Sequence, residues 1–264
     1  MIRITGVDLN RTDLSSLSGM EKLILHKKQN SSEIYHYDSL YALLFELKMR
    51  SNTVAAAKAL FISDASFATF NNTKGNEQYW ERTSQGGLKQ KHNAASSEAI
   101  RDIFRQGALY AFECATAMVI ILYKAALDSL GDDVFNAYFN HLLLYDWNYD
   151  NNLQLIANMD NEEAVPGDVL YFKNPDYNTK TPEWQGENVI LLADNLYFGH
   201  GIGIHTASQM IAYLNRHRIP GSSTSAYLTD LIEHPDFDYL QKIELPAAAK
   251  LSTRFLYLRR IYID

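Results

Sequence analysis

One apolar run constrains the fold of this chain more than any other feature. Between residues 115 and 122, in the sequence ATAMVIIL, the only polar side chain is Thr116. A helix formed by this run is apolar on every face, so it has to be buried on all sides. The 264 residues, 47% of them hydrophobic, are enough for one sizeable domain around such a helix. We therefore expect a central helix enclosed by other elements.

Other helices are indicated by apolar spacing and by capping residues. The longest covers residues 38–60, with Asp38 or Ser39 as its N-cap. A shorter helix over residues 96–107 begins at a serine and stops at Gly107. The pattern of a helix also appears in three further segments, which are residues 13–27, 206–218 and 225–233.

Strands are expected after the central helix, over residues 168–174, 188–193 and 196–205. Asp194 and Asn195 form a tight turn between the last two strands. Two shorter features are a strand over residues 2–7 and a hairpin over residues 79–91, around Gln85, Gly86 and Gly87. Helices and strands are thus expected in one domain.

Charge and composition exclude several classes of protein. A net charge of -7 argues against nucleic-acid partners, which need a basic face. No apolar run approaches the roughly 20 residues that span a bilayer, and the first residues, MIRITGVDLN, lack an apolar signal segment. A single cysteine cannot form an internal disulfide, which agrees with a reducing compartment. We expect a cytosolic protein with no membrane partner.

The only cysteine, Cys114, lies at the first turn of the central helix and follows Glu113. At the first turn of a helix, free N–H groups and the helix dipole favour a thiolate, the form that attacks carbonyl groups. The charge of Glu113 opposes that ionisation unless the carboxyl group is protonated or otherwise engaged. The alternative is an inert core cysteine, because free cysteine is among the most buried residue types.

A second carboxylate, Glu187, stands where the strand over residues 188–193 begins. The ordinary interpretation is a solvated strand end, since glutamate is rarely buried without a partner. The functional interpretation is a general base that faces the thiol.

Two histidines, His200 and His205, lie in the sequence GHGIGIH, but no third ligand with zinc-like spacing lies nearby. We predict no metal site. His200 remains a candidate for an orienting role, with a satisfied core histidine as the alternative. The sequence DWNYDN resembles a calcium loop, yet it has Asn151 at the sixth position and Ala157 at the twelfth, where such a loop needs glycine and glutamate.

Three aromatic residues, Trp147, Tyr171 and Trp184, flank the same segments. Aromatic residues at such places are often part of the core, but they also line channels that keep water from a reactive intermediate.

Several motifs together resemble a known family. They are YAFECATAMVIILY, LYFKNP, WQGENVILL and YFGHGIGI, with FELKMRSNTVAAAKAL, AIRDI and LYDW. The chain resembles the spore-coat transglutaminases of Bacillus-type spore formers, which are protein-glutamine gamma-glutamyltransferases, over roughly residues 1–240. The resemblance implies an α+β fold with an NlpC/P60-like (papain-like) core, in which a cysteine-bearing central helix packs on an antiparallel sheet with surrounding helices. It also implies one domain over residues 1–245, followed by a C-terminal extension, residues 246–264. The end of that extension, LSTRFLYLRRIYID, is compatible with an added strand.

The resemblance also implies roles for individual residues. Cys114 is expected as the nucleophile, Glu187 as its general base, Glu113 as a second carboxylate and His200 in a supporting role. In the wider papain-like fold the position of Glu187 normally holds a histidine, so a conventional Cys-His-Asp triad is not expected. The substrate is expected to contact four residues, which are Trp147, Tyr171, Trp184 and Asn188. No cofactor or metal is implied.

The implied activity joins glutamine and lysine side chains of proteins through a cysteine thioester, with release of ammonia and without calcium. The implied substrates are spore coat proteins, met in the mother cell and later on the coat. Two alternatives remain open from the residues. One is a cysteine amidase or peptidase that uses water as the acceptor, and the other is a structural coat protein with an inert cysteine.

Overall fold

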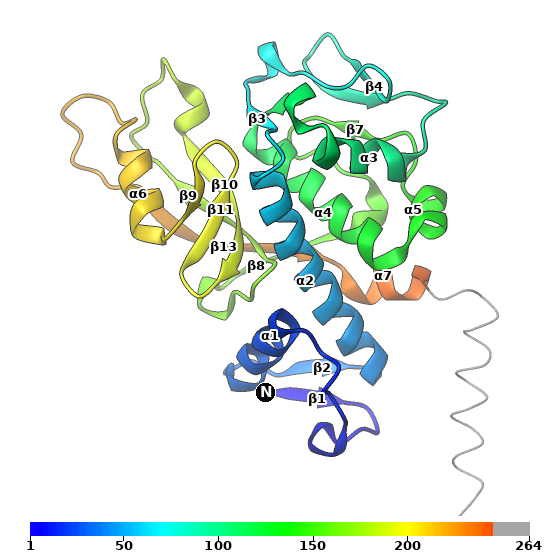
Figure 1. Cartoon of the computed structure of the whole chain (residues 1–264). Helices are drawn as coiled ribbons and strands as arrows, with labels where there is room; N and C mark the ends of the chain where they lie inside the picture. The colour runs from blue at the N-terminus through cyan, green and yellow to red at the C-terminus, as the bar shows by residue number, and fades with distance from the viewer. Residues whose placement is uncertain (245–264) are drawn as a thin grey trace, which may run out of the picture.

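The structure is a computed structural model, and it describes residues 1–244. Figure 1 shows a sheet on one side and a group of helices on the other, with one long helix running between them. The predicted C-terminal extension and its added strand lie outside the described residues. The helices are α1 (Gly19–Asn30), α2 (Leu40–Phe61), α3 (Ser96–Arg105), α4 (Cys114–Leu130), α5 (Asp132–Tyr138), α6 (Ala207–Asn215) and α7 (Phe237–Glu244).

The largest sheet has six antiparallel strands in the order β12-β11-β10-β9-β13-β8. Three smaller sheets pair β1 with β2, β3 with β6, and β4 with β5 and β7. The strands are β1 (Ile2–Ile4), β2 (Tyr35–Tyr37), β3 (Ser66–Phe67), β4 (Trp80–Arg82), β5 (Leu88–Gln90), β6 (Ala111–Phe112), β7 (Leu143–Leu144), β8 (Leu155–Met159), β9 (Val169–Lys173), β10 (Gly186–Ala193), β11 (Leu196–Gly199), β12 (Gly203–His205) and β13 (Tyr227–Pro235).

The expectation of a buried central helix is confirmed by α4. Every residue from Ala115 to Tyr123 is buried, because α4 packs against four other helices and against β10. The helix begins after its N-cap, Glu113, and ends at Gly131, whose φ of +82° interrupts the helical hydrogen bonds. The fold class expected from the resemblance, a cysteine-bearing helix packed on an antiparallel sheet, is also confirmed.

The strands that carry the site were largely predictable. The strands β9 and β10 and the turn that joins β10 to β11 lie where the sequence places them, and Asn195 adopts the left-handed conformation (φ +52°) that such a turn requires. The hairpin over residues 79–91 is formed by β4 and β5, with Gly86 at φ +92° in its turn.

Two predictions about the sheet were wrong. Residues 196–205 form two strands, β11 and β12, because the chain reverses after Gly199 and pairs with itself. Residues 225–233 were expected to be helical, but β13 occupies this stretch between β9 and β8. The hydrogen bonds and packing offered by two neighbouring strands outweigh a local helical pattern of apolar residues.

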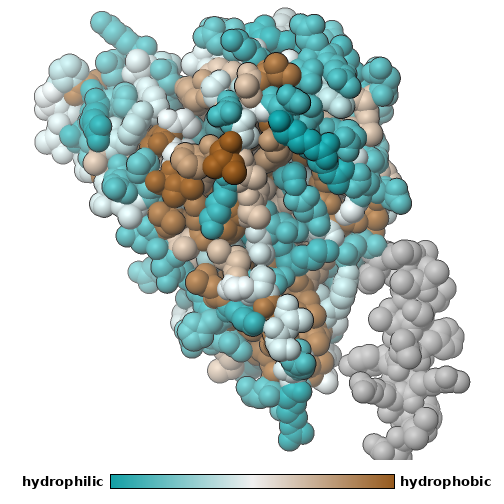
Figure 2. Space-filling view, viewed as in Figure 1, coloured by the Kyte–Doolittle hydropathy of each residue, from teal (hydrophilic) through white to brown (hydrophobic). Residues whose placement is uncertain are grey.

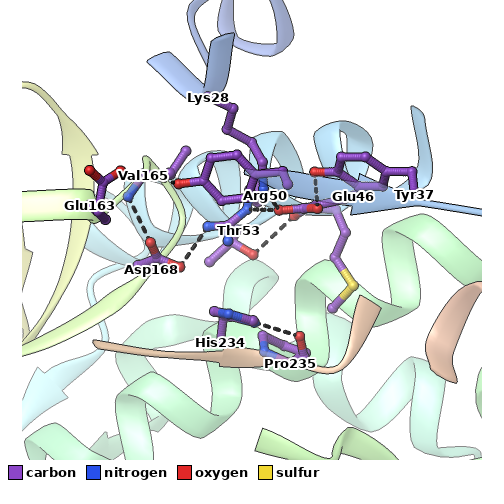
Figure 3. Close-up of polar contacts among 12 residues, drawn as sticks. Lys28, Tyr37, Glu46, Arg50, Thr53, Glu163, Val165, Asp168, His234 and Pro235 are labelled. Atoms are coloured by element: carbon purple, nitrogen blue, oxygen red, sulfur yellow. Dashed lines mark hydrogen bonds and ion pairs between the residues drawn. The ribbon is translucent and has the colours of Figure 1, made fainter. Parts of the chain in front are cut away.

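A buried network of charges joins α1, α2 and the segment that leads into β9 (Figure 3). Glu46 Oε1 accepts hydrogen bonds from Lys28 Nζ at 2.5 Å and from Arg50 Nε at 2.7 Å. Arg50 Nη1 donates to Asp168 Oδ1 at 2.6 Å, and the hydroxyl of Tyr37 donates to Glu46 Oε2 at 2.7 Å. Since all four charges are paired, the network fixes the N-terminal elements against the sheet.

Much of the surface seen in Figure 2 is hydrophilic, and hydrophobic side chains gather beside the end of α2, among other places. Phe61 and Ile62, at this end of the helix, are among the exposed large hydrophobic residues. Within residues 1–244, none of the helices combines the length and the apolar character needed to cross a membrane.

Candidate active site

The site is organised by the first turn of α4. Glu113 is the N-cap of this helix, and its side chain accepts hydrogen bonds from Ala115 N at 2.7 Å and Thr116 N at 2.6 Å. Each carboxylate oxygen of Glu113 therefore satisfies one N–H group that the helix start leaves free. This arrangement places Cys114 at the first helical position, with its carboxylate neighbour already engaged by the backbone.

The sulfur of Cys114 faces β10, where Asn188 Nδ2 donates a hydrogen bond to Sγ at 3.6 Å. Burial raises the pKa of the Cys114 thiol, and the negative charges of Glu187 and then of Glu113 raise it further. The hydrogen bonds from Asn188 act in the opposite direction. The balance between helix dipole and carboxylate that the sequence left open thus favours the neutral thiol.

Glu187 is not a solvated strand end, since only 1% of the residue is exposed. Within the described part of the chain, its Oε1 atom has no hydrogen-bond partner. Burial raises the pKa of Glu187 well above its ordinary value, and the charge of Glu113 adds to this effect. A buried carboxyl group beside a thiol, with no partner of its own, is suited to accept and return a proton near neutral pH.

His200 lies behind the site. It is 4% exposed, its ring stacks on Phe112 with centroids 4.8 Å apart, and its Nε2 lies 3.2 Å from the carbonyl oxygen of Ser66. Burial lowers the pKa of His200 to about 4, so the ring is neutral at pH 7. Phe112 is two residues before Cys114, and this packing makes His200 a support for the segment that carries the cysteine. Among residues 1–244, no group of three or more potential ligands is placed to hold a metal ion.

A cavity of about 600 Å³ opens onto Cys114 and Asn188. Four aromatic side chains form much of its wall: Phe67, Phe70, Trp147 and Tyr171. Tyr171 and Asn188 are opposite partners in neighbouring strands, which puts both on the cavity side of the sheet. Five of the eight predicted site residues therefore line this one cavity, namely Glu113, Cys114, Trp147, Tyr171 and Asn188.

The remaining three predicted residues lie around the cavity rather than along it. Glu187 and His200 are buried as described above. Trp184 stacks on His217 at 4.3 Å and on Phe67 at 5.9 Å between ring centroids, so it supports a residue of the cavity wall instead of forming the wall. A direct contact of Trp184 with substrate, expected from the resemblance, is not apparent from this position.

Sequence reasoning missed several residues of the cavity, including Phe67, Phe70 and Glu233. Phe67 ends the two-residue strand β3 and Phe70 begins a short 3-10 helix, and the sequence gives no signal for either residue beyond its aromatic character. Glu233 was missed because its segment was assigned to a helix, whereas the strand β13 directs it into the cavity.

Comparisons with known proteins agree with this geometry. A family model described as protein-glutamine gamma-glutamyltransferase matches residues 1–244. A protein of that name from Bacillus licheniformis is 43% identical over 242 residues, covering 91% of this chain and 98% of the relative, and one from Bacillus mycoides is 44% identical over 236 residues, covering 89% and 85%. A solved structure of a transglutaminase from Geobacillus stearothermophilus, without its C-terminal extension, superposes with a TM-score of 0.74 at 48% identity and covers 78% of this chain and 98% of that one.

Proposed function

This chain belongs to the protein-glutamine gamma-glutamyltransferase family, and from this premise we propose that Cys114 carries the acyl group between the two protein substrates as a thioester. The observation that supports this proposal is the interaction of Cys114, which lines an aromatic cavity, with the buried carboxyl group of Glu187. Neither a metal nor a cofactor is required by the steps that follow.

In the first half-reaction, the thiol proton of Cys114 passes to the carboxylate of Glu187, and Sγ attacks the carboxamide carbon of a glutamine. The raised pKa of Glu187 makes this transfer less costly than it is for an ordinary carboxylate. As the tetrahedral intermediate collapses, Glu187 gives the proton to the leaving nitrogen. Ammonia departs, and a thioester joins Cys114 to the substrate.

In the second half-reaction, a neutral lysine amine attacks the thioester. With a pKa of about 10.4, a free lysine is neutral only about one part in a few thousand at pH 7. Glu187, a carboxylate again after the first step, takes the proton from the attacking nitrogen. The thiolate of Cys114 then leaves and recovers this proton from Glu187, and an isopeptide bond joins the two proteins.

The surrounding residues support these steps in distinct ways. Asn188 donates to Sγ and thereby orients the sulfur and favours its thiolate form. Glu113 holds the start of α4 and contributes negative charge near the acceptor amine. The aromatic side chains of the cavity limit the access of water to the thioester, which otherwise hydrolyses.

We further propose that the cross-linked proteins belong to the spore coat and that the enzyme meets them in the mother cell, without calcium. The relatives from Bacillus species support this assignment. Deletion of the gene in the source organism, followed by extraction of the spore coat, tests it. The proposal requires that coat proteins become more extractable and that their isopeptide content falls, and an unchanged coat contradicts it.

The thioester is tested directly by mass. The protein is incubated with a glutamine-containing peptide in the absence of any amine and quenched in acid. Its intact mass is then measured by mass spectrometry. The proposal requires an adduct on Cys114 equal to the peptide minus ammonia, and its loss after addition of a primary amine. Absence of the adduct in the native protein while cross-linking proceeds excludes the thioester.

A further inference from the structure

The strand β13 separates two cavities. Side chains alternate between the faces of a strand, and here Leu231 and Glu233 line the cavity of Cys114, while Ile232 and His234 line a second cavity of about 370 Å³ on the opposite face. Glu233 therefore belongs to the same space as the nucleophile, although it is far from Cys114 in the sequence.

The charged side chains that line the catalytic cavity are all acidic. Four carboxyl groups line it, from Glu113, Asp146, Glu183 and Glu233, and the described residues of its wall include no lysine, arginine or histidine. The carboxylate of Glu113 is engaged by two backbone N–H groups. For Glu233, by contrast, the described residues provide neither a hydrogen bond to its side chain nor an ion pair, and burial raises the pKa of Glu233 with no cation to oppose it.

Strand pairing gives the position of Glu233 relative to the thiol. Asn188, which contacts Cys114, lies opposite Tyr171 on β9, and Glu233 lies opposite Val169 on the same strand. Glu233 is thus two strands away from Asn188, about 10 Å across the sheet, and two residues, about 7 Å, along it. At this separation its carboxyl group does not reach the nitrogen that attacks the thioester, but it can reach another group of the same acceptor.

We propose that Glu233 is a specificity-determining residue that selects amine acceptors with a second positive charge, several bonds away from the reacting amine. This inference rests on the proposed acyl transfer through Cys114 and names the acceptor class of that site. The acceptors concerned are diamines and lysine residues that have a second cationic side chain close by. The reacting nitrogen gives its proton to Glu187, while the second cation stays charged and pairs with the carboxylate of Glu233.

Two matched pairs of small acceptors isolate the second charge. Each pair consists of a diamine and an amino alcohol of equal length, 1,5-diaminopentane with 5-amino-1-pentanol and 1,8-diaminooctane with 8-amino-1-octanol. For each compound, kcat/KM for incorporation into a fixed glutamine substrate is measured at a pH of about 7.5, where a free amine is mainly protonated. The ratio of diamine to amino alcohol within a pair reports the preference for the second charge and cancels changes common to both acceptors.

The native protein is expected to prefer the diamine about tenfold at one or both lengths, because a partly buried ion pair contributes roughly that factor. Glu233→Gln is expected to reduce the ratio at least about threefold, and added salt is expected to reduce it in the native protein. Asp230→Asn is the matched control, since it removes the same charge from an exposed position of the same strand that does not line the cavity. This control is expected to keep the native ratio.

The outcomes separate the inference from the function on which it rests. If the native protein incorporates all four amines with ratios no higher than the statistical advantage of a second reactive amine, or if Glu233→Gln keeps the native ratio, the role of Glu233 is wrong while acyl transfer stands. If the native protein incorporates none of them, the proposed function itself fails.

Discussion

The carboxyl group of Glu187 occupies the space that a side chain on Gly199 would fill. A Cβ atom at Gly199 would lie 2.7 Å from Oε1 and 2.8 Å from Cγ of Glu187, in the neighbouring strand. The first glycine of the GHGIG motif is thus explained by the approach of a buried carboxyl group and not by an unusual backbone conformation.

Gly199→Ala should therefore impair catalysis by displacing Glu187. Displacement of a catalytic group by about 1 Å can reduce the rate by about a hundredfold, and we expect a loss of at least tenfold in cross-linking. Rates and urea unfolding are measured together, with Gly19→Ala as the control because no atom lies within 4 Å of a Cβ there. A folded Gly199→Ala protein with native activity contradicts the proposed position of Glu187 in the mechanism.

The ionisation of Cys114 should respond to the charge of Glu187. Since burial and the two carboxylates raise the pKa of the thiol, alkylation by iodoacetamide should reach half of its maximal rate above pH of about 8.5, the ordinary thiol value. Glu187→Gln removes one negative charge, so this midpoint should move to lower pH although cross-linking falls. An unchanged or higher midpoint in Glu187→Gln shows that the carboxyl group does not act on the thiol. Asp230→Asn serves as a remote charge control.

The cap and the charge of Glu113 are separable. Glu113→Ala removes the side chain that caps α4, and loss of an N-cap typically costs about 0.5–2 kcal/mol of stability. Glu113→Gln keeps a carbonyl oxygen for the cap but removes the charge. We expect Glu113→Ala to retain a partial rate of cross-linking and Glu113→Gln to be more stable than Glu113→Ala in urea unfolding. Complete loss of activity in Glu113→Gln assigns a larger chemical role to this carboxylate.

The buried network around Glu46 should dominate the stability of the N-terminal elements. Glu46→Gln leaves Lys28 and Arg50 buried with one carboxylate fewer, and breaking such a pair costs about 3–5 kcal/mol. Asp128→Asn, in the surface pair with Lys124, should cost less than about 1 kcal/mol. Urea unfolding measures both, and equal effects of the two substitutions contradict the assignment.

The same network predicts a dependence of stability on pH. Burial alone raises the pKa of Glu46, but the charges of Lys28 and Arg50 outweigh it and hold this pKa well below its usual range. A depressed pKa in the folded state stabilises the fold above the unfolded value of about 4.3, and this contribution is lost as the pH falls further. The difference in unfolding free energy between the native protein and Glu46→Gln should therefore shrink below pH of about 4.

The local sequence was sufficient to predict those features that depend only on the residues of one element. The run from Ala115 to Leu122 is apolar on every side, and its burial follows from composition alone. The turn at Asp194-Asn195 likewise needs only its own residues. Residues 225–233 failed as a prediction, because the strand β13 owes its form to β8 and β9, which lie far away in the sequence.

The same distinction between local and distant determinants applies to the residues of the site. Cys114 and Glu113 were placed at the start of a helix, which depends on neighbouring residues only. The burial of Glu187 depends on Gly199 in the neighbouring strand, which leaves room for the carboxyl group, so the sequence left a solvated strand end open as an alternative. Glu233 could not be assigned to the cavity without knowledge of β13. The resemblance supplied the roles that spacing did not.

The most direct test of the account is incorporation of a fluorescent primary amine into a glutamine-containing protein, with a calcium chelator present and ammonia recorded alongside. The account predicts incorporation and ammonia release by the native protein, neither by Cys114→Ala, and a loss of about a hundredfold or more in Glu187→Gln, the usual contribution of a general acid–base group. Native rates in either variant contradict the account, and ammonia release without incorporation identifies an amidase instead.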